Sequence, residues 1–139
     1  MSKNWKYFIP GYIMAAPLTL FGLLMAIYYR PQSIYFVDGC IEFVMPSRRH
    51  LIGGEWVGGQ TFGNVIFYRD ERTRQHIDLR VHERCHTVQA MVGGIFFAAA
   101  YGIHFLMNYR TLPFYEAYQA IWAEEQARAK QDNPNGWGA

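Results

Sequence analysis

The chain opens with a long uncharged segment. No charged residue lies between Lys6 and Arg30, and almost every position between them is apolar or aromatic. A helix needs ~20 mostly apolar residues to cross a bilayer, so this segment is long enough. It is too long for the apolar part of a signal sequence, and no small-x-small cleavage site follows it before Arg30. We expect residues 1–30 to form a hydrophobic helix that is a retained membrane anchor or an assembly contact. Pro10 and Pro17 keep a buried or interfacial helix open as the alternative.

Short apolar runs separated by turn residues follow this segment. Two of them, Ser33–Val37 and Cys40–Val44, flank the pair Asp38-Gly39. Aspartate and glycine both tolerate the positive φ of a two-residue type I′ turn, so the pattern predicts a β-hairpin. Residues 60–68 are another largely apolar run and predict one further strand.

Helical spacing replaces the strand pattern further along the chain. It extends from about Thr73 to Val92, where Gly93-Gly94 interrupts it. A second uncharged stretch, residues 87–109, could dip into a membrane or form the core of a small domain. Its internal glycines and histidine favour the core.

A last helix is expected near the C-terminus. It begins around Pro113, because proline is tolerated in the first turn, and ends at about Lys130. Residues 131–139 have the composition of a tail.

Composition narrows the classes of function. The chain of 139 residues is 51% hydrophobic and 17% charged, whereas soluble domains are about 25% charged. This excludes a disordered chain. The net charge of +2 is too small to indicate a nucleic-acid partner. Two cysteines, Cys40 and Cys85, are too few for a disulfide framework or a four-thiolate metal site.

The candidate chemistry lies in an H-E-x-x-H motif. His82 and His86 are four residues apart, so on a helix their imidazoles share one face and can bind a single ion. Zinc accepts imidazole nitrogen, and a catalytic zinc keeps one position open for water. Glu83 would then lie beside that water as a general base.

A catalytic zinc of this kind needs a third protein ligand. The histidine of the longer H-E-x-x-H-x-x-G-x-x-H motif would fall six residues after His86, where Val92 stands. A downstream carboxylate is the remaining choice, from Glu116, Glu124 or Glu125. Glu124 is favoured because it falls on the apolar stripe of the last helix, where a carboxylate is costly unless it meets a cation.

Two further polar residues could assist this site. Gln89 falls on the same helix face as the histidines, where it could orient a ligand or contact substrate, or it could simply cap the helix end. The hydroxyl of Tyr101 could stabilise a developing oxyanion. With ten tyrosines in the chain, however, a packing role is favoured for Tyr101.

Several other residues accompany the pentapeptide in a recognisable order: Gln89, Gly94, Phe97, Ala100-Tyr101, Ala117-Tyr118, Glu124 and Ala127-Arg128, with the strand-like Thr61-Phe62-Gly63-Asn64-Val65-Ile66 upstream. Together they resemble a family of small bacterial, membrane-associated, zincin-like metallopeptidases. The resemblance implies a zincin-like fold. It also implies His82, His86 and Glu124 as zinc ligands and Glu83 as the base.

These expectations combine into one architecture of the α+β class. It comprises the N-terminal membrane-type helix (residues 1–30), a zincin-like minimal domain (31–130) and the tail (131–139). The domain would contain a small antiparallel sheet, the H-E-x-x-H helix and a C-terminal ligand-bearing helix.

The expected function is that of a membrane-associated, zinc-dependent peptidase with Glu83 as general base. The expected partners are a peptide or protein substrate and membrane lipid, without nucleic acid. The alternative is a non-catalytic accessory subunit of a larger membrane or particle assembly, bound to other subunits, with a vestigial or structural metal site. A third hypothesis is a metal-dependent hydrolase that acts on a lipid or another non-peptide amide.

Overall fold

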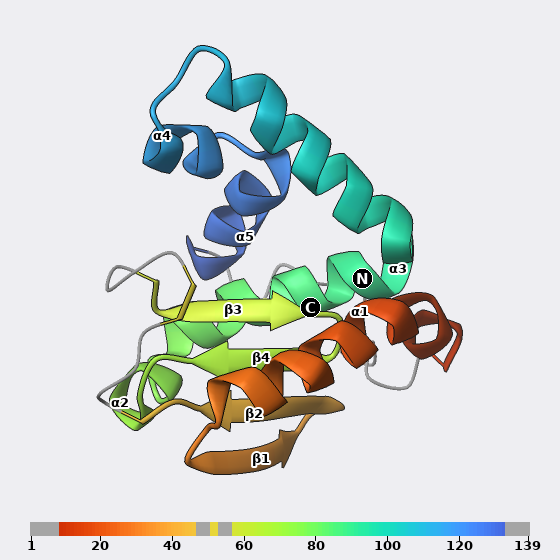
Figure 1. The fold of residues 1–139 in the computed structure, drawn as a ribbon, viewed down its shortest axis with the longest axis vertical. Coiled ribbons are helices and arrows are strands. Elements are labelled where there is room, and N and C mark those ends of the chain that lie inside the picture. The colour runs from red at the N-terminus through yellow and green to blue at the C-terminus, as the bar shows by residue number, and fades with distance from the viewer. Residues whose placement is uncertain (1–8, 47–50, 53–56, 133–139) are drawn as a thin grey trace.

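A four-stranded sheet with helices on both faces organises the chain (Figure 1). The computed structural model describes residues 9–46, 51–52 and 57–132. Its elements are, in order, α1 (Ile9–Tyr29), β1 (Ser33–Val37), β2 (Cys40–Val44), β3 (Gly59–Phe62), β4 (Val65–Tyr68), α2 (Glu71–Arg74), α3 (Ile77–Tyr109), α4 (Phe114–Gln119) and α5 (Trp122–Asp132). The α+β class is confirmed.

The sheet is mixed, so the prediction of an antiparallel sheet is wrong. The strand order is β1-β2-β4-β3. The pairs β1–β2 and β3–β4 are antiparallel, but β2 and β4 run parallel. The chain crosses over after β2, so that β4 lies beside β2 and β3 lies at the edge of the sheet.

The first hairpin is confirmed. Val37 pairs with Cys40, leaving Asp38 and Gly39 as a two-residue turn. Their φ values of 51° and 76° are the left-handed values that a type I′ turn needs.

The single strand predicted over residues 60–68 is instead a second hairpin. The chain reverses at Gly63, whose φ of 61° is left-handed. The backbone N–H of Asn64 then donates to Thr19 Oγ1 at 3.0 Å, which ties this turn to α1. The apolar run therefore supplies two strands rather than one.

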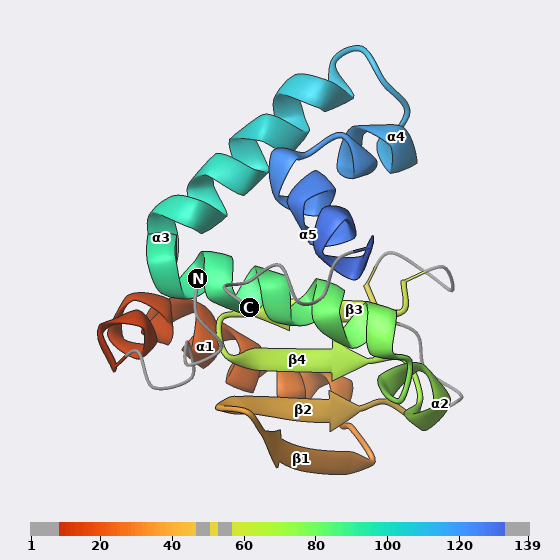
Figure 2. The same ribbon diagram turned by 180° about the vertical axis from the view of Figure 1, so that it is seen from behind.

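The two faces of the sheet pack against different helices. On one face Phe43 and Phe67 pack with Tyr29 of α1. On the other face Ile66 packs with Leu79 of α3. Figures 1 and 2 show this arrangement from opposite sides: α1 lies in front of the strands in the first view, and the first half of α3 in the second.

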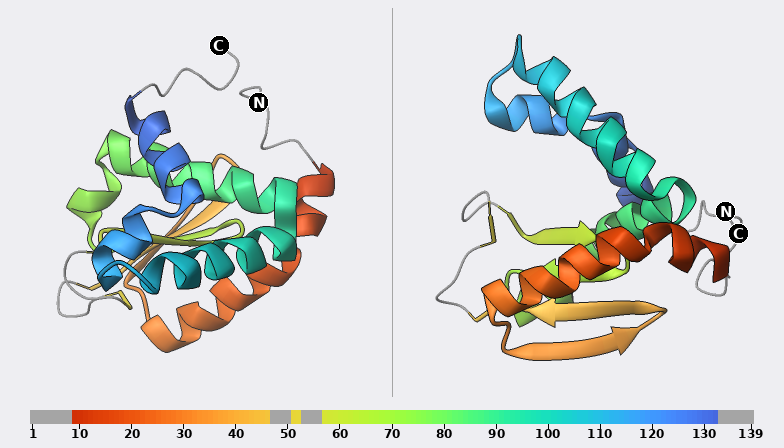
Figure 3. Two further views of the ribbon diagram at one scale, coloured as in Figure 1. Left: turned by 90° about the horizontal axis from the view of Figure 1, so that it is seen from above. Right: turned by 45° about the vertical axis from the view of Figure 1, so that its right-hand side comes forward.

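The long helix α3 bends at Gly94, whose φ of 55° and ψ of −134° are not helical. This confirms the break predicted at Gly93-Gly94. Beyond the bend, residues 95–109 form an outer arm that projects away from the sheet (Figure 3). The core interpretation of this stretch is wrong for the arm, because Phe96 and Ile103 are 76% and 59% exposed.

The last predicted helix is two helices, α4 and α5. They are separated at Ala120 and Ile121, where the fully buried Ile121 side chain turns the chain inward. The first N–H of α5, from Trp122, donates to His104 Nδ1 at 3.2 Å. Since α5 continues to Asp132, the first residues of the expected tail are helical. Residues 133–139 lie outside the described residues.

The N-terminal apolar helix is present as α1. By length and composition, α1 and α3 are both capable of crossing a membrane. Residues 1–8 of the predicted segment lie outside the described residues.

Candidate metal centre

Two histidines of the first half of α3 meet one turn apart, as their spacing predicts. The Nε2 atoms of His82 and His86 are 3.3 Å apart, and their rings are nearly perpendicular at 79°. Both side chains are about one-tenth exposed. Two imidazole nitrogens therefore point at the same small volume.

The carboxylate of Glu124 reaches this volume from α5. Its Oε2 lies 2.9 Å from His82 Nε2, and its Oε1 lies 3.1 Å from His86 Nε2. Glu124 is 2% exposed, whereas Glu116 and Glu125 are both exposed. Of the three carboxylates that the sequence offers, the structure brings Glu124 to the histidines.

These three residues could hold a metal ion, since their candidate ligand atoms all lie within 4.8 Å of one another. Two imidazole nitrogens and one carboxylate oxygen are a common protein ligand set of catalytic zinc. The residues present therefore fit the ion that the motif implies.

The close contacts between Glu124 and the histidines shift the pKa values of these groups. Burial opposes the charge on Glu124, but its hydrogen bonds to His82 and His86 outweigh burial and hold its pKa well below the usual range. Burial also lowers the pKa of His86, while its hydrogen bond to Glu124 and the nearby charge raise that pKa to about 9. The pair therefore carries opposite charges at neutral pH when no metal competes with the proton.

Glu83 is held beside the cluster by the edge strand β3. Its carboxylate is buried, and Thr61 Oγ1 donates to its Oε2 at 2.6 Å. At Gly59 an added Cβ would lie 2.8 Å from Glu83 Oε1, so glycine leaves room for the carboxylate. The contact with Thr61 was not predicted, because nothing local in the sequence shows which strand residue will face the helix.

Gln89 connects His86 to α5. His86 Nδ1 lies 2.9 Å from Gln89 Oε1, and Gln89 Nε2 donates to the carbonyl of Ala123 at 3.2 Å and to Gln126 Oε1 at 2.6 Å. A hydrogen bond to the outer nitrogen of a ligating histidine fixes the ring orientation and tautomer. Of the alternatives open for Gln89, this geometry favours orienting a ligand.

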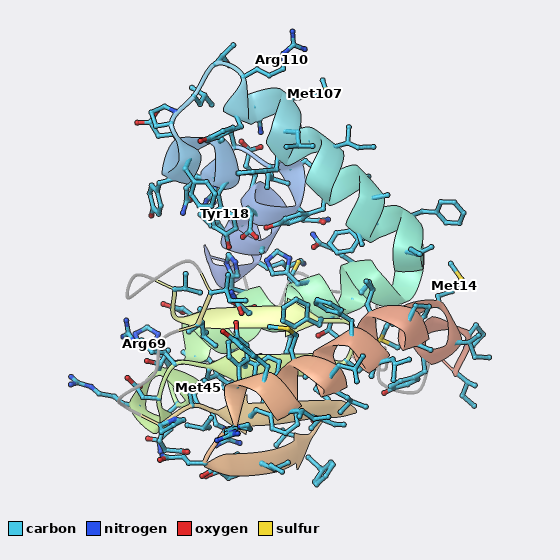
Figure 4. All side chains as sticks on the ribbon, viewed as in Figure 1. Met14, Met45, Arg69, Met107, Arg110 and Tyr118 are labelled. Carbon is cyan, nitrogen blue, oxygen red and sulfur yellow. The ribbon has the colours of Figure 1, made fainter. Side chains whose placement is uncertain are left out.

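Two tyrosines surround Glu124. The hydroxyl of Tyr101 donates to Glu124 Oε1 at 2.6 Å, so this residue contacts the candidate ligand directly. Tyr118 of α4 is also hydrogen-bonded to Glu124, and burial followed by the charge of Glu124 raises its pKa. Tyr118, labelled in Figure 4, lies between α4 and β3. Tyr118 is among the residues that carry the resemblance, but no role at the site was predicted for it.

A cavity of about 360 Å³ adjoins the cluster. Glu83, His86 and Glu124 form part of its wall. Most of its other lining is apolar and comes from α1, β3, the outer arm and α4, including Leu18, Phe62, Phe97, Ala98 and Phe114. A substrate group could therefore approach the candidate base and the ligand cluster from this cavity.

No known protein family, curated protein or solved structure matches this chain. The class of the site is accordingly defined by its own geometry: two helical histidines, a carboxylate from a later helix and a second carboxylate beside them.

Proposed function

We propose that this protein is a membrane-associated, zinc-dependent peptidase. One observation carries the proposal: His82, His86 and Glu124 converge from two helices while Glu83 is held beside them at the wall of a cavity. The sequence resemblance to zincin-like metallopeptidases points to the same chemistry.

In this proposal, the two histidines and Glu124 hold the ion. When bound, zinc supplies Lewis-acid activation of water and of the substrate carbonyl. Tyr101 and Gln89 hold Glu124 and His86 in place through the hydrogen bonds described above. Hydrogen bonds of this kind fix the orientation of a ligand, and their loss lowers metal affinity.

Glu83 is the proposed general base. Its Oε2 accepts from Thr61 Oγ1, which fixes the side chain, and its position at the cavity wall lets it take a proton from water and pass it to a leaving amine. The accessory-subunit alternative needs the histidines but no base, so Glu83 distinguishes the two functions.

Hydrolysis of a fluorogenic peptide with apolar residues around the scissile bond tests the proposal. We expect Glu83→Gln to lower kcat by about 10²-fold or more, because removal of a general base costs about that much. The exposed Glu125 provides a matched control, and Glu125→Gln should leave kcat unchanged. Equal, metal-dependent rates for wild type and Glu83→Gln would contradict the assignment of Glu83. Cleavage of a lipid amide but of no peptide would instead favour the non-peptide hydrolase.

A further inference from the structure

Helix α1 has the reverse of the pattern found in a water-soluble domain. Its buried face carries the small residues Gly11, Ala15 and Gly22, with Tyr29 buried at its C-terminal end. Its exposed face carries large apolar side chains: Ile9, Ile13, Leu20, Leu24 and Ile27. An added Cβ at Gly22 would lie 2.8 Å from Val65 Cβ, so the helix backbone packs closely on the sheet. Small residues inward and large apolar residues outward are typical of helices surrounded by lipid.

The outer arm repeats this reversal. Its polar residues Tyr101, His104 and Asn108 face the protein, where they bond Glu124, the Trp122 N–H and the Ala117 carbonyl. Phe97 and Phe105 are half-buried, but five of its large apolar residues are exposed: Ile95, Phe96, Ile103, Leu106 and Met107. An arm in water would place these two sets the other way round.

The sheet divides the molecule into an apolar side and a charged side. Ile34 and Phe36 of β1 pair with Phe43 and Ile41, so they lie on the face that carries α1, and both are exposed. The opposite face holds the fully buried Glu42, whose carboxylate lies 3.1 to 3.7 Å from three arginines: Arg74, Arg80 and Arg84. Seen from above (Figure 3, left), α1 and the outer arm lie toward one side and α2 toward the other.

This arrangement excludes a crossing of the bilayer by either helix. If α1 crossed, the adjoining sheet would enter the hydrocarbon with its open β1 and β3 edges and the Glu42 cluster, and unpaired backbone groups and charges are too costly there. The arm is too short, because residues 95–109 rise only about 22 Å at ~1.5 Å per residue, against a hydrocarbon thickness of about 30 Å.

We propose that α1, the outer arm and the β1 side chains Ile34 and Phe36 form a membrane-binding face. The two helices lie in the plane of the membrane within one leaflet, and neither helix crosses the bilayer. Arg30 and Arg110 directly follow the two helices and are exposed, which places cations where anionic headgroups lie.

The same residues favour lipid over a protein partner. Among the exposed large side chains of α1 and the arm, the hydroxyl groups belong to Tyr28 and Tyr109, each at a helix end. Tyrosine at the edge of an apolar band is typical of a membrane–water interface. A protein interface of this size would carry about one hydrogen bond per 100–200 Å², and the middle of these two helix faces offers few groups to form them.

The cavity adjoins this face, since Leu18 of α1 and Phe97 of the arm both line it. A substrate would therefore reach Glu83 beside the membrane. The membrane-binding face does not depend on the metal or on catalysis.

Depth-dependent quenching tests this topology. Cysteine replaces, one position at a time, Ile13, Leu20 and Ile27, which are 71%, 60% and 74% exposed along the outward face of α1. The native Cys40 and Cys85 are buried, and the unsubstituted protein, labelled in the same way, measures their background. Each introduced cysteine carries an environment-sensitive fluorophore, and the full-length protein is reconstituted into phosphatidylcholine vesicles containing phosphatidylglycerol. The lipids carry a doxyl quencher either near the headgroup or near the chain end. Gln75→Cys, on the charged side and exposed, is the control.

We expect the shallow quencher to be the stronger one at all three α1 positions, and neither quencher to affect Gln75→Cys, because in-plane helices insert only about 5–10 Å. Strongest quenching of the Leu20 site by the deep quencher, with shallow quenching at the Ile13 and Ile27 sites, would show a crossing helix and overturn the proposal. Absence of quenching at all three sites would show that lipid does not cover this face. Zinc content, measured on the same samples, reports separately on the proposed function.

Discussion

Both ring nitrogens of His86 are engaged. Nδ1 lies 2.9 Å from the oxygen of Gln89, while Nε2 faces Glu124 at 3.1 Å. An acceptor at Nδ1 holds the proton there in the neutral ring, so that Nε2 presents its lone pair to an ion. The orientation of one ligand thus depends on a residue that does not touch the metal position.

Replacing Gln89 by leucine should weaken zinc binding. Without the amide oxygen, His86 loses the partner of Nδ1, and such losses lower metal affinity by about 10–100-fold. Competition with a chromophoric chelator measures the affinity. Gln75→Leu, at an exposed position on α2's C-terminal end, is the control and should bind zinc as the wild type does. Equal affinities for the two variants would rule out an orienting role for Gln89.

Zinc affinity should rise with pH in the neutral range. Glu124 and the nearby charges raise the pKa of His86 to about 9, so below that pH a proton must leave the ring before it can bind metal. For one proton, affinity should increase by about tenfold per pH unit and level off near about pH 9. Chelator competition at a series of pH values measures this affinity. An affinity that did not change with pH would mean that His86 is neutral throughout.

Without metal, the raised pKa of His86 affects the stability of the fold. Its contribution is fully present below the ordinary histidine pKa of 6.5 and is lost as pH rises through about 9.

At the scale of elements, the bend in α3 determines where the arm leaves the sheet. Gly94 has a φ of 55°, and an added Cβ would lie 2.6 Å from the carbonyl oxygen of Met14 on α1. The bend thus combines a left-handed backbone with close approach of a second helix, and only glycine satisfies both. The arm returns the chain through α4 to α5, so the position of Glu124 depends on this bend.

Two alanine substitutions in α3 should have opposite effects. Gly94→Ala should lower the free energy of unfolding by about 1–3 kcal/mol, because alanine strains the left-handed backbone and meets Met14. Gly102→Ala should raise it by ~0.5–1 kcal/mol, because no heavy atom lies within 4 Å of its added Cβ and alanine favours a helix. Denaturant unfolding in detergent micelles measures both. Similar values for the two variants would mean that the bend does not constrain the fold.

The elements that could be predicted from sequence were those with local signals. The Asp38-Gly39 turn, the Gly94 break and the spacing of the two histidines each depend on residues a few positions apart. The parallel pairing of β2 with β4 depends on a crossover between distant segments, and no local sequence pattern predicts it. The contact of Thr61 with Glu83 joins residues 22 positions apart through tertiary packing. Likewise, the separation of α4 from α5 follows from burial of Ile121 rather than from a helix-breaking residue.

At the scale of the whole molecule, the candidate metal centre joins parts that are distant in sequence. The histidines lie on the half of α3 that packs on the sheet, and Glu124 comes back to them on α5 after the chain has passed through the arm and α4. A bound ion would therefore link the sheet layer to the C-terminal helices beside the cavity. Helix α1 of the proposed membrane face lies on one face of the sheet. The Glu42–arginine cluster lies on the other face, beside the half of α3 that carries the histidines.

The zinc content of the purified chain is the first test of the metal centre formed by His82, His86 and Glu124. Wild type, Glu83→Gln, His86→Ala and the exposed control His76→Ala would be purified without chelators and analysed for zinc. We expect about one zinc per chain in all but His86→Ala, which lacks a ligand. Absence of zinc from the wild type, or an equal zinc content in His86→Ala and His76→Ala, would contradict the assignment of this centre.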